Sequence, residues 1–370
     1  MPTRHSAKTP DPKLVYHRLS RWFAKNSRPF PWRGEVDPYR VWISEIILVQ
    51  TAAEVGVPRY KRFLRRFPTL LSLIRAKVDD VMKEWEGLGY YHRARNLHRA
   101  AQVIAREHFG RFPSDYDAIR ALPGIGDYCA AAIHNFCFGG RHVPIDANVA
   151  RVGARLFGVA GDVRSSKTRL EVRRHYEALM TVGLGSVWTE ALIGLGATVC
   201  TPRNPKCDLC PLGDSCTARR LGRESTLGLP AKRESRKVVN VACGIIRRAD
   251  GRVLIAQRLD TGLLPNLWEF PGGKRDGNEK LADTCKREIR EELAVAVKVC
   301  ERRMVIEHAY SHYAVRLHVF ECRYVSGQPR AIGAQKFRWL KVDELGKLAF
   351  PTANKRIISE LVSEERQSAK

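Results

Sequence analysis

The stretch that most constrains the fold is Leu122-Pro123-Gly124-Ile125-Gly126, which lies between two apolar helical patterns at 116–121 and 128–136. Two glycines on either side of one apolar residue allow a tight turn and a close approach to another surface. The first N–H groups of the second helix then point outward and can bind a phosphate. The pattern predicts a helix–hairpin–helix in which Gly124 and Gly126 contact a DNA backbone.

A carboxylate follows this hairpin. Asp146 stands directly before a helix that is expected to begin near Asn148. One segment therefore offers both a backbone anchor for DNA and an acidic side chain. An ordinary helical turn in which Asp146 is only an N-cap explains the same residues, so the pattern alone leaves both interpretations open.

The charge balance indicates the class of partner. The 370 residues include 64 lysines and arginines against 39 acidic residues, a formal net charge of +25. Such an excess favours a polyanion, nucleic acid above all, and an anionic membrane surface is the competing partner. No strongly amphipathic basic helix stands out, no apolar run is long enough to span a bilayer, and the N-terminus has no secretory signal. We expect no membrane association and a cytoplasmic location, associated with the bacterial nucleoid.

Four of the ten cysteines gather in one short stretch, separated by six, two and five residues. Four thiolates at this spacing in a basic protein can hold zinc or an iron–sulfur cluster, and spacing alone does not decide between them. The scattered cysteines fit a reducing compartment. The clustered residues are Cys200, Cys207, Cys210 and Cys216.

The hydrophobic pattern divides the chain. After a loose basic tail at 1–10, residues 11–216 are expected to form a helical domain that ends in the cysteine loop at 200–216. Apolar residues recur at helical spacing in 15–23, 41–57, 70–81, 94–104 and 170–182. Residues 217–237 are charged and lack periodicity, which predicts a linker.

Residues 238–370 show a different pattern and are expected to form an α+β domain. A β-hairpin is predicted from 238–246 and 253–258, joined by Ala249-Asp250-Gly251. The further elements expected are an acidic helix at 279–293, strands at 295–305 and 313–324, and a closing helix from about Thr352.

With the hairpin, Asp146 and the cysteines in register, residues 28–216 resemble the adenine DNA glycosylase (MutY) family of the endonuclease III superfamily. The motifs that carry the resemblance are Pro31-Trp32-Arg33, Asp37-Pro38-Tyr39, Trp42-Ile43-Ser44-Glu45, Gln50-Thr51, Gly87-Leu88-Gly89-Tyr90-Tyr91, Arg93-Ala94-Arg95-Asn96-Leu97 and Glu190-Ala191-Leu192. The resemblance implies an all-α core with a 4Fe–4S cluster loop. It also implies a monomer that removes adenine mispaired with 8-oxoguanine in double-stranded DNA. The sequence indicates no particular protein partner.

The resemblance also implies catalytic roles. Glu45 would be the general acid, because its apolar surroundings raise the pKa of a carboxyl group. Asp146 would stabilise the sugar cation, and Tyr128 and Asn148 would orient the sugar and the water. Glycosylases that also cleave the strand carry a lysine where this chain has Tyr128, whose hydroxyl forms no Schiff base. We therefore expect base excision without strong lyase activity.

The recognition residues follow from the same resemblance. Those expected at the adenine pocket are Trp32, Arg33 and Glu190, and those expected beside the lesion are Gln50, Thr51, Leu88 and Tyr90. The chain departs from the family pattern at Val49, where a glutamine is usual, and at Ala147, where a glycine is usual. The first departure bears on lesion contacts, and the second leaves Asp146 and Asn148 in place.

Residues 238–365 resemble a MutT-type Nudix domain. The Nudix box runs from Gly273 through Glu279 to Arg287-Glu288-Ile289-Arg290-Glu291-Glu292, with Ala294 in place of its final glycine. Glu288, Glu291 and Glu292 fall on one helix face and would hold Mg²⁺ against a diphosphate. Tyr310-Ser311-His312 resembles the Phe-Ser-His motif that reads 8-oxoguanine in adenine glycosylases. Activity on 8-oxo-dGTP is therefore a possible second function.

Three alternatives stay open at this level. The chain could be a nucleotide-pool hydrolase that its helical half tethers to DNA, or a non-catalytic, cluster-bearing DNA-binding protein. It could also be an endonuclease III-type glycosylase for oxidised pyrimidines, which Tyr128 disfavours.

Overall fold

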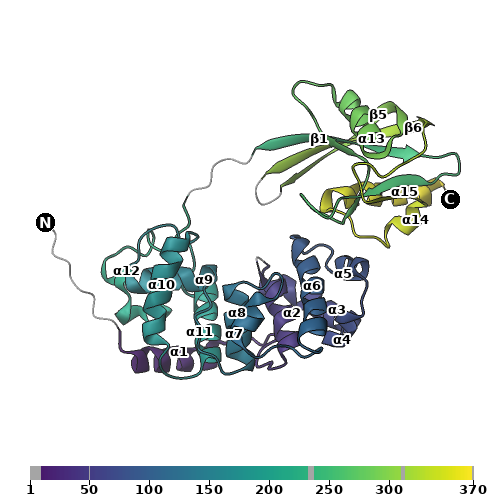
Figure 1. Cartoon of the computed structure of the whole chain (residues 1–370). Helices are drawn as coiled ribbons and strands as arrows, with labels where there is room; N and C mark the ends of the chain where they lie inside the picture. Colours follow the sequence, from purple (N-terminus) through teal and green to yellow (C-terminus); the bar gives the residue numbers. More distant parts are fainter. Residues whose placement is uncertain (1–9, 50, 232–236, 310–312, 369–370) are drawn as a thin grey trace. The chain divides into compact units, whose positions relative to one another are not determined.

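The computed structural model describes residues 10–49, 51–231, 237–309 and 313–368. They form two compact units (Figure 1). The first comprises Met1–Arg75 and Asn96–Arg233, and the second comprises Ala76–Arg95 and Glu234–Lys370. In the described part of the chain, no helix combines the length and apolar character needed to cross a membrane.

The first unit is helical, as predicted. Its helices are α1 (Pro12–Asn26), α2 (Pro38–Leu48), α3 (Ala53–Arg66), α4 (Leu70–Ile74), α7 (Tyr116–Ala121), α8 (Asp127–Cys137), α9 (Ala147–Phe157), α10 (Ser166–Leu179), α11 (Gly185–Thr198) and α12 (Thr217–Arg220), with most of α6 (His92–Glu107). An Asp-Pro pair begins both α1 and α2, because the aspartate accepts an N–H of the first turn and proline lacks the N–H that would have no partner.

Two runs that periodicity predicts as continuous are divided. The run 41–57 breaks between Leu48 and Ala53, and the run 70–81 breaks between Ile74 and Val78, where α5 (Val78–Glu84) begins. Neither break contains the glycine or proline that would indicate it in the sequence. Apolar spacing continues across both breaks, so tertiary packing decides where each helix ends.

The core of the first unit forms where α9 packs between α10 and α11. Val149, Tyr176, Trp188 and Leu195 are buried in it. Gly153 allows the close approach of α9 to α10, because a Cβ at this position would lie 2.7 Å from the Tyr176 ring. The core thus holds α9, and with it Asp146 at its start, in a fixed position.

The first part of the segment 217–237, which was predicted to be a linker, is folded in the structure. Helix α12 and the turns after it pack on the first unit, and Leu227 is only 3% exposed. The Arg155 Nε donates to the Leu227 carbonyl at 3.0 Å, and the Val163 N–H donates to the Leu229 carbonyl at 3.4 Å. Charge and weak periodicity misled the prediction because backbone groups, rather than an apolar face, make these contacts.

The second unit is built on a mixed sheet. Its strands are β1 (Val238–Arg247), β2 (Val253–Gln257), β3 (Trp268–Glu269), β4 (Gly272–Lys274), β5 (Ala296–Ala309), β6 (Ala314–Ser326) and β7 (Lys336–Leu340). The order is β3-β2-β1-β6-β5, with β4 paired to β1 and β7 to β2. The predicted hairpin is confirmed, with Arg247 of β1 opposite Val253 of β2, whereas β1 and β6 run parallel.

Helices cover both faces of this sheet. They are α13 (Leu281–Leu293), α14 (Val342–Leu345) and α15 (Thr352–Ser368). Alternate residues of β1 enter two cores, Ala242 and Ile246 beside Ile289 of α13, and Cys243 and Ile245 beside Ile357 of α15. The period of two along the strand therefore positions α13, which carries the acidic cluster.

Candidate active site

A cavity of about 510 Å³ opens in the first unit. It gathers residues that are far apart in the sequence and that come from the loop before α2 and from α2, α8, α9 and α11. The predicted site residues among those that line it are Trp32, Arg33, Glu45, Thr51, Tyr128, Asp146, Asn148 and Glu190. The tertiary structure thus brings the four predicted catalytic residues and three adenine-pocket residues to one place.

Glu45 lies on the buried side of α2 and is 6% exposed. Burial raises its pKa to about 7, although a hydrogen bond with Tyr128 acts in the opposite direction. Its Oε2 atom is buried, and none of the described residues is hydrogen-bonded to it. At neutral pH this side chain therefore exists in both protonation states, and one of its oxygens has no hydrogen-bond partner among the described residues.

Asp146 is the N-cap of α9 and also lines the cavity. Its Oδ1 accepts the Val149 N–H at 2.7 Å, and its Oδ2 accepts the Asn148 Nδ2 at 2.9 Å. Burial raises the pKa of Asp146, while these hydrogen bonds favour the ionised form and oppose the shift. The capping interpretation and the functional one are thus compatible, because the cap orients the carboxylate.

A hydrogen-bonded chain connects this carboxylate to the cysteine loop. The Asn148 Oδ1 accepts Arg151 Nη2 at 2.7 Å, and the Arg151 Nε donates to the Cys200 carbonyl at 2.7 Å. Sequence reasoning missed Arg151, which is buried on α9. A basic residue one turn after a capping aspartate on an apolar helix was the available signal.

The residues predicted for the adenine pocket form an aromatic and ionic wall. Trp32 stacks on Phe30 with ring centroids 5.1 Å apart, and Tyr60 meets it edge-on at 5.5 Å. Arg33 forms an ion pair with Glu190 and lies 4.9 Å above the Phe23 ring. Such a wall combines stacking surfaces with hydrogen-bonding groups, as recognition of a nucleobase requires.

The hairpin has the geometry expected from its glycines. Gly124 has φ +79°, and a Cβ there would lie 2.5 Å from the Asn96 side chain. Gly126 is the N-cap of α8 and is exposed, with open space where a side chain would project. Ile125 between them is buried. Asp127, which sequence reasoning missed, forms ion pairs with Arg120 and Arg173, so its charge at the start of α8 is neutralised.

The four cysteines of the loop form no disulfide in the described part of the chain, and they are half-buried. Burial raises the pKa of Cys210 to about 12, so a thiolate there needs a compensating positive charge such as iron supplies. No three potential ligand side chains in the described part of the chain stand close enough to hold a single metal ion.

The remaining predicted recognition residues lie elsewhere. Leu88 and Tyr90 belong to the second unit and are not among the residues that line this cavity. Gln50 and the motif Tyr310-Ser311-His312 lie outside the described residues.

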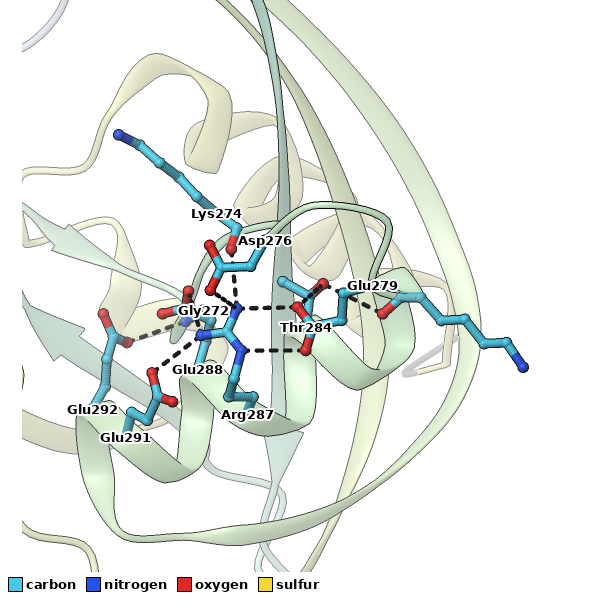
Figure 2. Close-up of polar contacts among 10 residues, drawn as sticks. Gly272, Lys274, Asp276, Glu279, Thr284, Arg287, Glu288, Glu291 and Glu292 are labelled. Carbon is cyan, nitrogen blue, oxygen red and sulfur yellow. Dashed lines mark hydrogen bonds and ion pairs between the residues drawn. The ribbon is translucent and has the colours of Figure 1, made fainter.

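The Nudix box forms a second acidic site on α13 (Figure 2). Arg287 lies at its centre, and the carboxylates of Glu279, Glu288 and Glu291 each accept its guanidinium at 3.1 Å (Figure 2). The Glu292 Oε2 instead accepts the Gly272 N–H at 3.1 Å. The three predicted Mg²⁺ ligands thus share a face, but in this structure Glu288 and Glu291 are bound to Arg287 rather than turned toward one point.

A cavity of about 340 Å³ adjoins this helix. Glu288 and Glu292 line it together with Glu269 and Arg258. The sequence did not predict the ion pair between Glu269 and Arg258. Burial and the neighbouring Glu269 raise the pKa of Glu292 to about 8. Gly273 makes room for the cluster, because a Cβ there would lie 2.2 Å from the Glu288 carboxylate.

Family models match three parts of the chain. The HhH-GPD superfamily of base excision DNA repair proteins matches residues 43–179, the iron–sulfur binding domain of endonuclease III matches residues 200–216, and the NUDIX domain matches residues 242–360. Together they confirm the predicted fold class, a helix–hairpin–helix core with an iron–sulfur loop followed by a Nudix domain.

Adenine DNA glycosylases are similar over much of the chain. That of Buchnera aphidicola subsp. Schizaphis graminum (strain Sg) is 31% identical over 255 residues, which cover 68% of this chain and 73% of that protein. That of Mycobacterium tuberculosis (strain CDC 1551 / Oshkosh) is 35% identical and covers 64% and 76%. The Homo sapiens protein is 27% identical and covers 92% and 72%.

Among solved structures, a thermostable thymine-DNA glycosylase covers 57% of this chain and 97% of its own length, with 28% identity and a TM-score of 0.52. This likeness supports the helical fold. The similarity to adenine DNA glycosylases and the three domain matches agree with the cavity that holds Glu45 and Asp146. The chain therefore belongs to the adenine DNA glycosylase family of base-excision repair proteins.

Proposed function

We propose that this protein hydrolyses the N-glycosidic bond of adenine mispaired with 8-oxoguanine, or with guanine, in duplex DNA. The observation that carries the proposal is the unpartnered, buried Oε2 of Glu45 in the same cavity as Asp146. A general acid needs a pKa near the working pH and a place beside its substrate, and Glu45 has such a pKa and lines the cavity that would hold the base.

In the proposed mechanism, adenine leaves the base stack and enters the cavity between Trp32, Arg33 and Glu190. Protonated Glu45 donates its proton to adenine N7, so the bond between N9 and C1′ breaks with its electron pair on the base. The ionised Asp146 stabilises the cationic sugar. Water then adds to C1′ and passes a proton to the Glu45 carboxylate, while Tyr128 and Asn148 orient the sugar and the water.

The proposed enzyme has no strong lyase activity. Burial raises the pKa of the Tyr128 hydroxyl well above its ordinary value, so it stays neutral and hydrogen-bonds to Glu45. A phenol cannot form the Schiff base on which strand cleavage depends. Borohydride treatment during turnover should trap no covalent DNA complex, and trapping at the level of a lysine-bearing glycosylase would contradict the proposal.

Lesion specificity is assigned to Thr51 at the edge of the residues that line the adenine cavity and to residues that do not line it. We infer that Gln50 and Tyr90 enter the duplex, with Thr51 and Leu88 close to the lesion. The Ser311 hydroxyl of Tyr310-Ser311-His312 would accept the N7 hydrogen that 8-oxoguanine has and guanine lacks. The protein is proposed to act as a monomer on this mispair. Its four cysteines would hold the cluster in the 4Fe–4S form, which braces the loop that carries Arg203 and Lys206.

The decisive experiment compares adenine release from duplexes that carry 8-oxoguanine or guanine opposite adenine. Wild type should act faster on the first duplex, and Glu45→Gln should abolish release from both. Glu171→Gln, an exposed change on α10, is the matched control and should leave release intact. Release by Glu45→Gln at the wild-type rate would refute the assignment of the acid.

A second activity, Mg²⁺-dependent hydrolysis of 8-oxo-dGTP, is favoured by the cavity beside α13. Glu288 and Glu292 line it, and the Arg287–Glu279 ion pair braces the helix that carries them. Glu288, Glu291 and Glu292 would hold Mg²⁺, which supplies positive charge against the diphosphate when bound. Glu291, whose side chain is 59% exposed, is free to exchange Arg287 for a cation at small energetic cost.

This activity is tested by pyrophosphate release from 8-oxo-dGTP. Glu291→Gln should abolish release and leave adenine excision intact, and Asp283→Asn on the exposed side of the same helix should change neither. No release from wild type in the presence of Mg²⁺ would refute the second activity.

A further inference from the structure

The segment 76–95 lies between two parts of the helical unit in the sequence, yet it belongs to the second unit. It carries Leu88 and Tyr90, the residues proposed to act at the lesion. Its contacts within the second unit concentrate on 348–355, the loop and first turn of α15 that follow α14.

Glu86 is the centre of these contacts and is 9% exposed. Its Oε2 accepts Lys83 Nζ at 2.8 Å and Lys355 Nζ at 2.9 Å. Its Oε1 accepts the Phe350 N–H at 3.4 Å. One carboxylate therefore connects its own segment to both a side chain and the backbone of 348–355, and hydrogen bonds of this charged kind are the stronger ones.

Two neighbours of Glu86 reinforce the attachment. The Lys83 Nζ also donates to the Leu348 carbonyl at 3.1 Å. The Tyr91 hydroxyl donates to the Phe350 carbonyl at 3.4 Å and accepts the Gly87 N–H at 3.4 Å. The residues on both sides of Leu88 and Tyr90 are thus attached to the same loop.

The part that is held has an uncommon backbone conformation. Gly87, Gly89 and Tyr90 have φ values of 88°, 68° and 46°. The last is the left-handed region in a non-glycine residue, which persists only where surrounding contacts support it. The Trp85 Nε1 donates to the Gly89 carbonyl at 3.1 Å and closes the loop.

The anchor itself is rigid. Phe350 and Ala353 are buried in the sheet's core, and the Asn354 Oδ1 accepts the Phe270 N–H at 3.0 Å. The Trp268 N–H donates to the Ala349 carbonyl at 2.9 Å. Glu86 therefore connects the loop 87–90 to the Nudix core rather than to another surface loop.

We infer that Glu86 is a positioning residue for lesion recognition. It fixes the loop 87–90 on the Nudix core, so that Leu88 and Tyr90 are presented by the same body that is proposed to read 8-oxoguanine. This inference rests on the proposed preference for 8-oxoguanine:adenine mispairs. Loss of the attachment should reduce that preference, whereas the adenine cavity, which contains none of these residues, keeps its chemistry.

The test is single-turnover adenine excision opposite 8-oxoguanine and opposite guanine by the full chain. For Glu86→Gln we expect the rate opposite 8-oxoguanine to fall about tenfold and the rate opposite guanine less than about twofold, as one lost hydrogen bond to a charged group allows. Lys355→Met, at a more exposed position, should act in the same direction. The double variant should lose no more of the 8-oxoguanine preference than Glu86→Gln does, because both substitutions remove the same Glu86–Lys355 contact.

Asp79→Asn, an exposed change on α5 of the same segment, is the matched control and should preserve the preference. Equal proportional losses on both duplexes would show a merely structural role and overturn the inference, as would an unchanged preference in both single variants. If Glu86→Gln does not fold, Lys355→Met alone decides. Equal wild-type rates on the two duplexes would refute the proposed lesion specificity, and the inference with it, whereas a wild-type preference retained in the variants refutes the inference alone.

Discussion

Glu45 and Asp146 are two carboxylates of one cavity that have different surroundings. Glu45 is buried on α2 with a hydrogen bond to Tyr128, and its pKa is raised to about 7. Burial raises the pKa of Asp146 as well, but Asp146 accepts two N–H groups at the start of α9, which favour its ionised form. Environments that separate two carboxyl groups in this way allow one to act as the acid and the other as the anion.

The burial that suits Glu45 to act as an acid also lowers the stability of the protein at higher pH. Its pKa rises from 4.5 to about 7 on folding, so the folded protein keeps a proton that the unfolded chain releases. The free energy of unfolding therefore falls as the pH rises through this window. Glu45→Gln should be inactive yet more stable than wild type at pH 8, by about 1–3 kcal/mol, with a smaller difference at pH 5.

Urea denaturation of both proteins at the two pH values measures this difference. Glu171→Gln, at an exposed position, should show no such pH dependence. A difference between wild type and Glu45→Gln that does not grow with pH would contradict the raised pKa.

At the scale of elements, the hairpin between α7 and α8 uses its two glycines differently. Gly124 needs its left-handed φ and lies against Asn96, whereas Gly126 has φ −95° and open space around it. The first glycine serves the turn. The second leaves the backbone at the start of α8 accessible to a phosphate.

Alanine at each position should separate these roles. Gly124→Ala should lower the free energy of unfolding by about 1–3 kcal/mol, because the new methyl group is strained and meets Asn96. Gly126→Ala should leave thermal stability unchanged and weaken duplex binding. Thermal melting and fluorescence anisotropy measure the two effects, and an equal loss of stability in both variants would refute the distinction.

Helix α13 ends at a residue whose side chain disfavours the backbone conformation that it adopts. Ala294 is its C-cap with φ 56°, in the place where the Nudix box usually has glycine. Ala294→Gly should therefore raise the free energy of unfolding by about 0.5–1 kcal/mol. Ala282→Gly, inside the same helix, should lower it by about as much. Chemical denaturation measures both, and destabilisation by Ala294→Gly would show that contacts of the methyl group outweigh the strain.

At the scale of the whole molecule, the boundary between the units does not follow the order of the chain. Residues 76–95 leave the helical unit, join the second unit through Glu86, Tyr91 and Arg95, and then return. The boundary between the two units therefore does not fall at a single point of the sequence.

Removal of residues 232–370 should expose this segment. The truncated chain keeps the Lys83–Glu86 pair but loses the contacts of Lys83 with Leu348 and of Glu86 with Phe350 and Lys355. Trypsin should therefore cleave it after Lys83 at least tenfold faster than the full chain. Mass spectrometry of the fragments identifies the site. Equal cleavage in the two proteins would show that the helical unit alone holds the segment.

Much of the fold could be predicted because its signals are local. The cysteine spacing, the two hairpin glycines, the alternation in β1 and the carboxylates of α13 each act through neighbours in sequence. The breaks at 49–52 and 75–77, and the packing of 217–231, were not predictable in this way. They depend on contacts such as that from Arg155 to Leu227, whose partners lie far apart in the chain.

The candidate site shows the same division. Glu45, Tyr128 and Asp146 were found as residue types in a pattern, but Arg151, Asp127 and Glu86 were not. Their roles depend on partners that no local spacing specifies. These are the Cys200 carbonyl for Arg151, two arginines for Asp127, and the distant Lys355 for Glu86.

The sequence by itself determined the chemistry that is present and the elements that carry it, because helix period, strand period and turn residues act over a few positions. Only the tertiary structure decided that Glu45 and Asp146 share a cavity, that burial raises the pKa of Glu45, and that residues 76–95 join the second unit. Burial, and contact between residues distant in the chain, are properties of the packed molecule, and no stretch of sequence holds them.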